Sequence, residues 1–206
     1  MAVNVKSFAP YGFWANSYAI EYKDNIALVD IGCLTQEIEN YVIENKGNIK
    51  YILLTHCHFD HICGVEKLRE LVDARVIVHK DDKSGLNDEN YSLCGNFQIS
   101  QPNIKNIETI SNGDKITFGD KTINVMHTPG HTQGSVCYII DDVMLSGDTL
   151  FQGSIGRTDF ITGNVSKMME SLNKIKELKV DYKIYSGHGE STTLFAELQN
   201  NPYLNL

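Results

Sequence analysis

The chain has 206 residues, of which 42% are hydrophobic, so it is long enough to bury the core of a single domain spanning residues 1–206. Its 26 acidic and 18 basic residues give a formal charge of -8 and form no basic patch, which argues against nucleic acid as a partner. The first residues lack a basic start followed by an apolar run, and no later apolar stretch approaches the length of a membrane span. We therefore expect a soluble, cytoplasmic protein with no membrane partner.

The first third of the chain alternates β-prone and helical segments. Residues 16–22 and 26–31 are two β-prone runs separated by a polar Lys-Asp-Asn, which is typical of a hairpin. Thr35 can cap a helix that runs to about Asn45, where apolar residues recur at helical spacing. Gly47 follows as the stop of this helix.

A strand over residues 49–54 leads into the densest polar cluster of the sequence. Within six positions the cluster holds four potential metal ligands, which are His56, His58, Asp60 and His61. Residues i and i+2 of an extended segment lie on the same side, so the first two histidines can face one ion. The other two should lie on the turn into a helix and can hold a second ion. Packing alone does not explain so many polar groups at one strand end.

The segment after this cluster changes from regular to irregular. A helix over residues 64–71 and a strand over residues 75–79 complete a β-α-β-α-β run. Residues 81–106 then consist of Asp, Asn, Ser and Gly with scattered apolar residues that include Leu93 and Phe97. Long loops of this kind tend to be functional, so this one could form a wall of the active site; the alternative is a mobile insertion.

Two further predicted hairpins also end in potential metal ligands. A hairpin over residues 115–126 leads to His131, and one over residues 135–145 leads to Asp148. The five cysteines are odd in number and contain no Cys-x-x-Cys pair, so they indicate neither a disulfide framework nor a thiolate zinc site. We expect them to be reduced and mostly buried.

The last part of the chain repeats the pattern once more. A last strand is predicted over residues 182–185 and closes on His188, before a terminal helix over residues 193–199. An amphipathic helix over residues 164–178 should bury Val165, Met168, Met169, Leu172 and Ile175. Polar clusters thus stand just past the strand ends in both halves, which predicts a sandwich of two mixed sheets flanked by helices, with the chemistry at one edge.

The residues that follow the strand ends form a set of nitrogen and oxygen ligands: His56, His58, Asp60, His61, His131, Asp148 and His188. This set suits two divalent ions, with zinc preferred and iron or manganese as alternatives. We expect His56, His58 and His131 to hold one ion and Asp60, His61 and His188 to hold the other. Asp148 would bridge the two ions, and a hydroxide between them would be the nucleophile. Asp60 and Asp148 are therefore the candidate catalytic residues.

Four motifs resemble the metallo-β-lactamase superfamily in order and spacing: Thr55-His56-x-His58-x-Asp60-His61, Pro129-Gly130-His131-Thr132, Gly147-Asp148 and Gly187-His188-Gly189. Within that superfamily the chain resembles the glyoxalase II-like, or hydroxyacylglutathione hydrolase-like, branch, but without its C-terminal helical domain. The resemblance runs from Asn16 to the C-terminus. It implies an αββα sandwich of the α/β (or α+β) class, the same two-metal assignment and hydrolysis of an ester-like bond.

Residues 151–159 look like a segment that glyoxalase II-like hydrolases share with persulfide dioxygenases. Within it, Arg157 and Asp159 are expected to form a buried ion pair that locks the loop. His79 and His127 fall outside the motifs, and structural or supporting roles are expected for both.

The sequence favours a thiolester hydrolase acting on a small-molecule thioester. A thiolate leaves easily because the pKa of its thiol is about 8.5, so a metal-activated water can cleave a thioester without a general acid. The expected substrates are small hydroxyacyl thioesters, S-lactoylglutathione among them, with weak dependence on the thiol and little activity on β-lactams. The alternatives are a mononuclear iron persulfide dioxygenase and, less favoured, a non-catalytic scaffold stabilised by metal.

Overall fold

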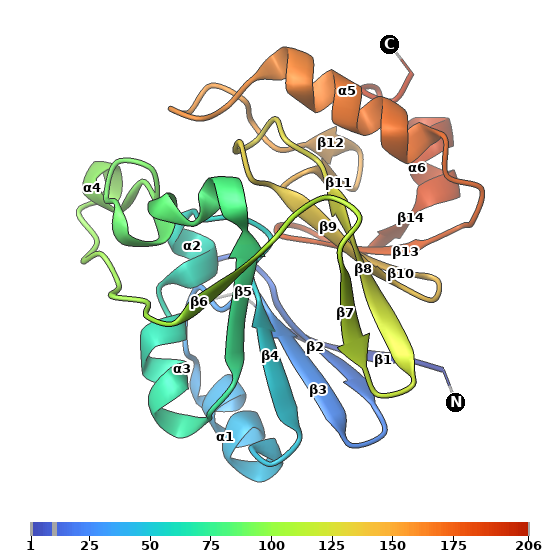
Figure 1. The fold of residues 1–206 in the computed structure, drawn as a ribbon. Helices are drawn as coiled ribbons and strands as arrows, with labels where there is room; N and C mark the ends of the chain where they lie inside the picture. The colour runs from blue at the N-terminus through green and yellow to red at the C-terminus, as the bar shows by residue number, and fades with distance from the viewer. Residues whose placement is uncertain (1, 10–11, 206) are drawn as a thin grey trace.

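Two six-stranded mixed sheets pack face to face, and helices cover the outer face of each sheet (Figure 1). The computed structural model describes residues 2–9 and 12–205, so positions 1, 10, 11 and 206 of the expected 1–206 domain lie outside the described residues. This arrangement confirms the prediction of an αββα sandwich.

The first sheet is antiparallel at one side and parallel at the other. Its strands, in spatial order, are β1 (Asn4–Phe8), β2 (Ser17–Tyr22), β3 (Asn25–Val29), β4 (Ile49–Leu53), β5 (Arg75–His79) and β6 (Ile107–Ile110). The first three pair antiparallel, and β3 to β6 pair parallel. The parallel pairs need crossover connections, and helices α1 (Gln36–Asn45) and α3 (Val65–Leu71) supply two of them. The predicted hairpin, helices and strands of this half are confirmed, whereas β1 and β6 were not predicted.

The start of α1 follows the predicted capping chemistry. The Thr35 hydroxyl accepts a hydrogen bond from the backbone N–H of Ile38 at 3.3 Å. This bond satisfies one of the backbone donors that a helix leaves free in its first turn. Gly47 lies in the turn that follows the helix, as expected.

The second sheet is antiparallel except at one pair of strands. Its spatial order is β14 (Thr192–Thr193), β13 (Lys183–Ser186), β10 (Val143–Gly147), β9 (Val136–Ile140), β8 (Lys121–His127) and β7 (Lys115–Phe118). Strands β10 and β13 pair parallel. The strand predicted over residues 182–185 is confirmed as β13, but it is not the last strand, because the two-residue strand β14 follows and pairs with it. So short a strand carries too little hydrophobic alternation to be recognised.

Helices α5 (Val165–Lys176) and α6 (Leu194–Asn200) pack against the second sheet. On α5, Met168, Leu172 and Ile175 are fully buried, as expected. Val165, the first residue of the helix, is 62% exposed, so its predicted burial was wrong. The apolar face of α5 therefore begins one turn later than the sequence pattern indicates.

The long irregular segment over residues 81–106 packs against the body of the protein. It contains two short 3₁₀ turns, with the first beginning at Lys80, and the single-turn helix α4 (Cys94–Phe97). Leu86, Leu93 and Cys94 within it are buried. The segment is thus a packed part of the fold. This favours its interpretation as a wall of the active site over its interpretation as a mobile insertion. A second single-turn helix, α2 (Phe59–Ile62), and a small hairpin of β11 (Leu150–Phe151) and β12 (Ser154–Ile155) complete the structure.

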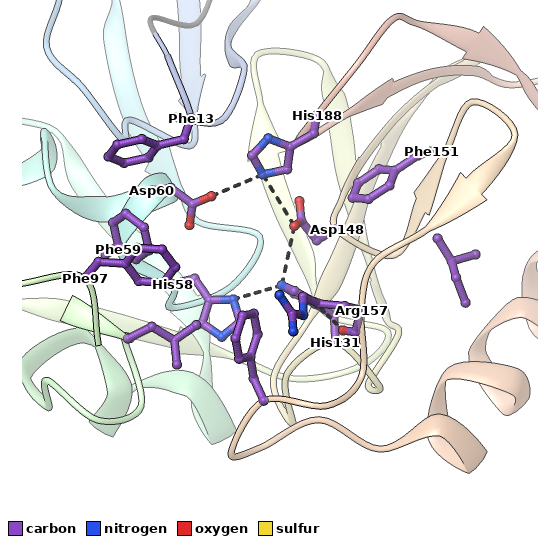
Figure 2. A pocket seen from close by; sticks show the side chains of 13 residues that line it. Phe13, His58, Phe59, Asp60, Phe97, His131, Asp148, Phe151, Arg157 and His188 are labelled. Atoms are coloured by element: carbon purple, nitrogen blue, oxygen red, sulfur yellow. Dashed lines mark hydrogen bonds and ion pairs between the residues drawn. The ribbon is translucent and has the colours of Figure 1, made fainter. Parts of the chain in front are cut away.

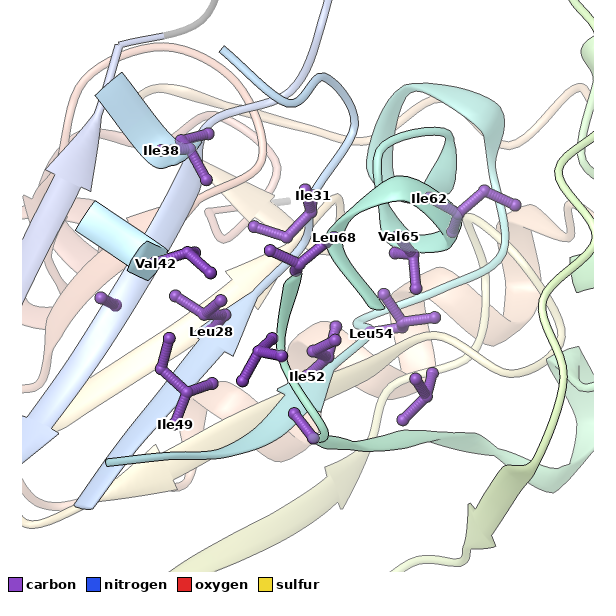
Figure 3. Packing of buried hydrophobic residues seen from close by; sticks show 14 of the residues in the cluster. Leu28, Ile31, Ile38, Val42, Ile49, Ile52, Leu54, Ile62, Val65 and Leu68 are labelled. Atoms are coloured by element: carbon purple, nitrogen blue, oxygen red, sulfur yellow. The ribbon is translucent and has the colours of Figure 1, made fainter. Parts of the chain in front are cut away.

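Three apolar layers and a smaller cluster around Phe59, Leu93 and Cys94 form the core of the described residues. One layer lies between the first sheet and helices α1 and α3, and Figure 3 shows its side chains, among them Leu28, Ile52 and Leu68. A second layer fills the space between the two sheets, and a third lies between the second sheet and helices α5 and α6. Burial of each such side chain contributes about 1.5–3 kcal/mol. In the described part of the chain, no helix combines the length and apolar character needed to cross a membrane.

Tyr138 joins the two sheets at a position next to the ligand cluster. It lies fully buried on β9, and its hydroxyl donates to the backbone carbonyl of Leu54 at 2.9 Å. We expect Tyr138→Phe to leave that buried carbonyl unpaired and to lower the free energy of unfolding by about 1–3 kcal/mol. Denaturant unfolding measures the loss, with the exposed Tyr203→Phe as the matched control. Equal stability of the two variants would show that this bond contributes nothing to the joining of the sheets.

Candidate metal centre

All seven ligand candidates come together at one edge of the sandwich. They form three groups whose ligand atoms lie within 4.8 Å of one another: His56, His58 and His131; His56, His61 and Asp148; and Asp60, His61 and His188. They come from the loop after β4, from α2, and from the ends of β8, β10 and β13. Strands far apart in the sequence therefore deliver them to a single place, and Figure 2 shows five of the seven side chains around it.

Asp148 lies at the centre of the cluster. Its Oδ2 is 3.4 Å from Nε2 of His131 and 3.6 Å from Nε2 of His188. Its Oδ1 is 3.3 Å from Nε2 of His61. This one carboxylate thus contacts side chains on both sides of the cluster, and its two oxygens face different partners. Such a position suits a group shared by two ions.

The two sides of the cluster have their own short contacts. On one side, Nδ1 of His58 and Nε2 of His131 lie 2.8 Å apart. On the other, Nε2 of His188 lies 3.1 Å from Oδ2 of Asp60. Two imidazole nitrogens at the first distance need either a proton or a cation between their lone pairs. The pair therefore marks a position where positive charge is favoured.

Unpaired buried polar atoms concentrate in this cluster. In the part of the chain that the structure describes, five buried side-chain atoms lack a hydrogen-bond partner, and four belong to the ligand candidates. These four are Nε2 of His56, His58 and His61, and Oδ1 of Asp148. Each buried polar group left unpaired costs about 1–3 kcal/mol. Divalent ions would satisfy such nitrogen and oxygen atoms, so the residues fit the metal ions that the sequence motifs imply.

The protonation states of His56, His58 and Asp148 also suit metal binding. Burial, followed by the neighbouring histidine rings, lowers the pKa of His56 well below its ordinary value. Burial likewise lowers the pKa of His58 to about 3, so both rings are neutral near pH 7, which is the form that binds metals. Burial opposes protonation of His61 as well, but the surrounding carboxylates outweigh it and raise the pKa of that ring. For Asp148, burial is outweighed by the histidines, which lower its pKa and keep it ionised.

Asp30 is a buried carboxylate behind the cluster that the sequence did not single out. Its Oδ2 lies 2.9 Å from Nδ1 of His61 and accepts a 2.7 Å hydrogen bond from the Thr55 hydroxyl. Its Oδ1 accepts the backbone N–H of Thr55 at 2.8 Å. A carboxylate on the far nitrogen of a ligand histidine fixes the orientation of the ring and raises its basicity. The sequence feature that could have pointed to Asp30 is its position directly after the apolar run Ile-Ala-Leu-Val.

Asp82 is a second buried carboxylate that the sequence interpretation missed. Its Oδ2 accepts the backbone N–H of Cys57 at 3.0 Å and the hydroxyl of Thr132 at 2.7 Å. Its Oδ1 accepts the backbone N–H of Gly134 at 2.7 Å. Burial raises the pKa of Asp82, and these hydrogen bonds act in the opposite direction. The carboxylate ties the loop of the first histidine motif to the loop that carries His131.

The loop over residues 151–159 touches the cluster through its backbone. The carbonyl of Arg157 lies 2.7 Å from Nδ1 of His131, which can donate to it. The guanidinium of Arg157 forms two 2.7 Å hydrogen bonds to Asp159, but their side chains are 59% and 66% exposed. The expectation of a buried ion pair was therefore wrong, since the loop lies at the surface and leaves both charges hydrated.

The remaining histidines and the cysteines lie outside the three groups. His79 and His127 stack on each other, with ring centroids 3.9 Å apart and planes inclined by 12°. With Asp81 they form a separate group of three. The five cysteines are all free, and three of them are buried, in line with the expectation of reduced thiols. Burial raises the pKa of the Cys57 thiol well above its ordinary value, so this group is inert beside the cluster.

The cluster opens into a cavity of about 380 Å³. Five of the ligand candidates line it together with apolar side chains, among them Leu93 and Phe97 of the 81–106 segment. This confirms that the long loop forms a wall of the candidate site. The volume lies within the range of small-molecule sites, about 300–1,000 Å³.

Comparison with known proteins agrees with this geometry. A model of the metallo-β-lactamase superfamily matches residues 12–188. The chain is 35% identical over 195 residues to the probable metallo-hydrolase YqgX of Bacillus subtilis, covering 93% of this chain and 92% of that protein. It is 30% identical over 193 residues to the hydroxyacylglutathione hydrolase GloC of Haemophilus influenzae, covering 88% of each.

Solved structures share the fold over nearly the whole chain. The BLEG-1 B3 metallo-β-lactamase has a TM-score of 0.90 at 31% identity, covering 98% of this chain and 100% of that one. TTHA1623 in a di-iron-bound form has a TM-score of 0.84 at 28% identity, with the same coverage. The chain belongs to the metallo-β-lactamase superfamily. Its class is that of the metal-dependent hydrolases, while the glyoxalase II-like branch stays a prediction.

The role of Asp30 can be tested by removing its charge while keeping its shape. We expect Asp30→Asn to lower metal affinity by about 10–100-fold, because an amide polarises the His61 ring less than a carboxylate does. Competition with a chromophoric chelator measures the affinity. Asp120→Asn, at an exposed position paired with Lys23, is the control. If both variants bind metal equally well, Asp30 does not support His61.

Gly187 offers a steric test of the cluster. A Cβ added there would overlap Oδ1 of Asp148 and lie 2.7 Å from Cε1 of His61. We expect Gly187→Ala to displace the carboxylate and to reduce the metal content of the purified protein, as measured by elemental analysis. Gly47→Ala is the matched control, since no atom lies within 4 Å of its added Cβ. A full metal content in a folded Gly187→Ala variant would contradict the central position of Asp148.

Proposed function

We propose that this protein is a dinuclear metal-dependent hydrolase of thioesters. The observation that carries the proposal is the position of Asp148, whose oxygens face His131 on one side and His61 and His188 on the other. We assign His56, His58 and His131 to one ion. Asp60, His61 and His188 are assigned to the second ion, with Asp148 shared between the two. The di-iron form of the related TTHA1623 supports a site for two ions in this fold.

The bound ions would lower the pKa of a coordinated water towards about 7 and polarise the substrate carbonyl. The residues of the chain then have two tasks. Asp60 and Asp148 are ionised, so they can accept hydrogen bonds from the attacking water and hold its orientation. The Arg157 carbonyl contacts Nδ1 of His131, and the Asp30 carboxylate contacts Nδ1 of His61. These contacts fix the orientation of the two rings.

The choice of a thioester rests on the leaving group. The cavity is lined by apolar residues, by ligand candidates and by Arg157, whose guanidinium does not release a proton near neutral pH. Amide cleavage needs an acid to protonate the departing nitrogen, whereas a thiolate leaves unaided because the pKa of its thiol is about 8.5. The similarity to GloC, which is named as a hydroxyacylglutathione hydrolase, supports the same bond type.

The experiment combines metal analysis with a substrate panel. Protein purified without chelator should contain two metal ions per chain and hydrolyse thioesters. A chelator should abolish turnover, and zinc, iron or manganese should restore it. Asp148→Ala should lose metal and turnover together, whereas Asp142→Ala, at an exposed turn position, should keep both.

The same panel separates the alternatives. A single iron with oxygen consumption on a persulfide and no thioester turnover would replace the proposal by a persulfide dioxygenase. Faster hydrolysis of β-lactams than of any thioester would assign the activity named for BLEG-1. Bound metal without any turnover would leave a metal-stabilised scaffold.

A further inference from the structure

The walls of the active-site cavity are aromatic. Five phenylalanines line it together with Leu93 and Ile155: Phe13, Phe59, Phe97, Phe151 and Phe160. Figure 2 labels Phe13, Phe59, Phe97 and Phe151 among the side chains that surround Asp60, Asp148 and His188. The rings come from four separate parts of the sequence, so the fold assembles this surface in one place.

One wall is a continuous group of rings at the cavity mouth. The ring of Phe59 lies 4.6 Å from that of Phe97 and 5.8 Å from that of Phe13, measured between centroids. Phe97 and Phe13 are nevertheless 51% and 58% exposed. Single exposed apolar residues need no explanation, but exposed rings gathered around a concave site mark a binding surface.

Two further rings of the lining lie beside the ligand candidates themselves. The ring of Phe160 lies 5.5 Å from that of His58, and the ring of Phe151 lies 6.0 Å from that of His188. If a substrate's carbonyl carbon is held at the cluster, the substrate groups a few bonds away from that carbon therefore contact aromatic rings. Among the described residues that line the cavity, only the ligand candidates and Arg157 carry hydrogen-bonding side chains. The groups next to the scissile bond therefore meet mostly apolar surface.

Away from the ligand cluster, the lining of the cavity does not suit a substrate with several charged groups. Among the described residues that line it, Arg157 is the single Arg or Lys, and its Nε and Nη2 donate to the carboxylate of Asp159. Glutathione carries two carboxylates and one ammonium group, which need charged partners to replace their hydration. Away from the ligand cluster, the described lining offers them one Arg, whose guanidinium is already paired with Asp159.

We propose that the enzyme selects thioesters with an apolar acyl group, either a medium-length alkyl chain or an aryl group, over lactoyl and other hydroxyacyl groups. The inference rests on the proposed thioesterase function and names its substrate class. The acyl chain packs against Phe13, Phe59 and Phe97, and its burial provides binding energy that orients the carbonyl at the cluster. A lactoyl hydroxyl in the same place would lose its water without gaining a partner.

The test varies the acyl group on one neutral thiol. Acetyl, butyryl, hexanoyl, phenylacetyl and lactoyl thioesters of N-acetylcysteamine are compared with the metal-loaded protein. Each added methylene should raise kcat/KM about 3- to 4-fold up to the capacity of the cavity, in keeping with the transfer free energy of a CH₂ group. Phenylacetyl should exceed lactoyl by more than 10-fold. Hexanoylglutathione should be no better than the neutral hexanoyl thioester.

Two phenylalanines, one in the cavity lining and one outside it, give a matched pair of variants. Phe97→Ala removes a ring from the cavity mouth, whereas Phe195→Ala removes a ring that is 43% exposed on α6 and does not line the cavity. Phe97→Ala should reduce the ratio of hexanoyl to acetyl kcat/KM about 5-fold or more. Phe195→Ala should leave this ratio unchanged. Thermal unfolding of both variants checks that the fold is intact.

The outcomes separate this inference from the function on which it rests. A flat acyl series, a preference for lactoyl, or equal ratios in the two variants would overturn the apolar specificity while leaving a thioesterase. No turnover of any thioester by protein that holds two metals would remove the proposed function and this inference with it.

Discussion

Two buried carboxylates hold the loops on which the candidate metal centre depends. Asp30 accepts hydrogen bonds from the backbone and hydroxyl of Thr55 and faces the ring of His61. Asp82 accepts backbone N–H groups from Cys57 and Gly134. These donors belong to irregular loops, where no strand ladder can satisfy them, and a buried N–H without a partner is costly. Each carboxylate thus converts a loop into a fixed element, and Asp82 fixes loops from both sheets relative to each other.

The sandwich supplies the rest of the positioning. Strands β4, β8, β10 and β13 all end at the same edge of the sandwich, so side chains from distant segments meet there. The buried bond from Tyr138 to the carbonyl of Leu54 joins β9 to the end of β4, just before the first histidine motif. Asp148 occupies the middle of the cluster and contacts both of its sides. Rigid elements on both sheets therefore hold a set of ligands that no single loop could hold.

The aromatic cavity and the polar cluster support each other chemically. Rings of Phe160 and Phe151 lie directly beside His58 and His188. Apolar walls lower the local polarity, and charge interactions become stronger where water is excluded. The same walls offer binding surface to a substrate group next to the reacting carbonyl. In this site, the charged groups of the ligand cluster and the apolar surface that binds the substrate lie within one small volume.

The sequence alone determined which residues are ligand candidates and where most strands and helices lie, whereas the tertiary structure decided how they combine. Local patterns carry the first kind of information: the spacing of His56, His58, Asp60 and His61 is visible in six residues, and the hydrophobic period reveals β4 or α5. The short or edge strands β1, β6 and β14 have too weak a pattern to be recognised. Asp30 and Asp82 look like ordinary strand-end and loop residues until burial shows their partners. The exposure of Arg157 and the meeting of Phe13, Phe59 and Phe97 depend on contacts between segments far apart in the chain, and such contacts arise only when the layers pack.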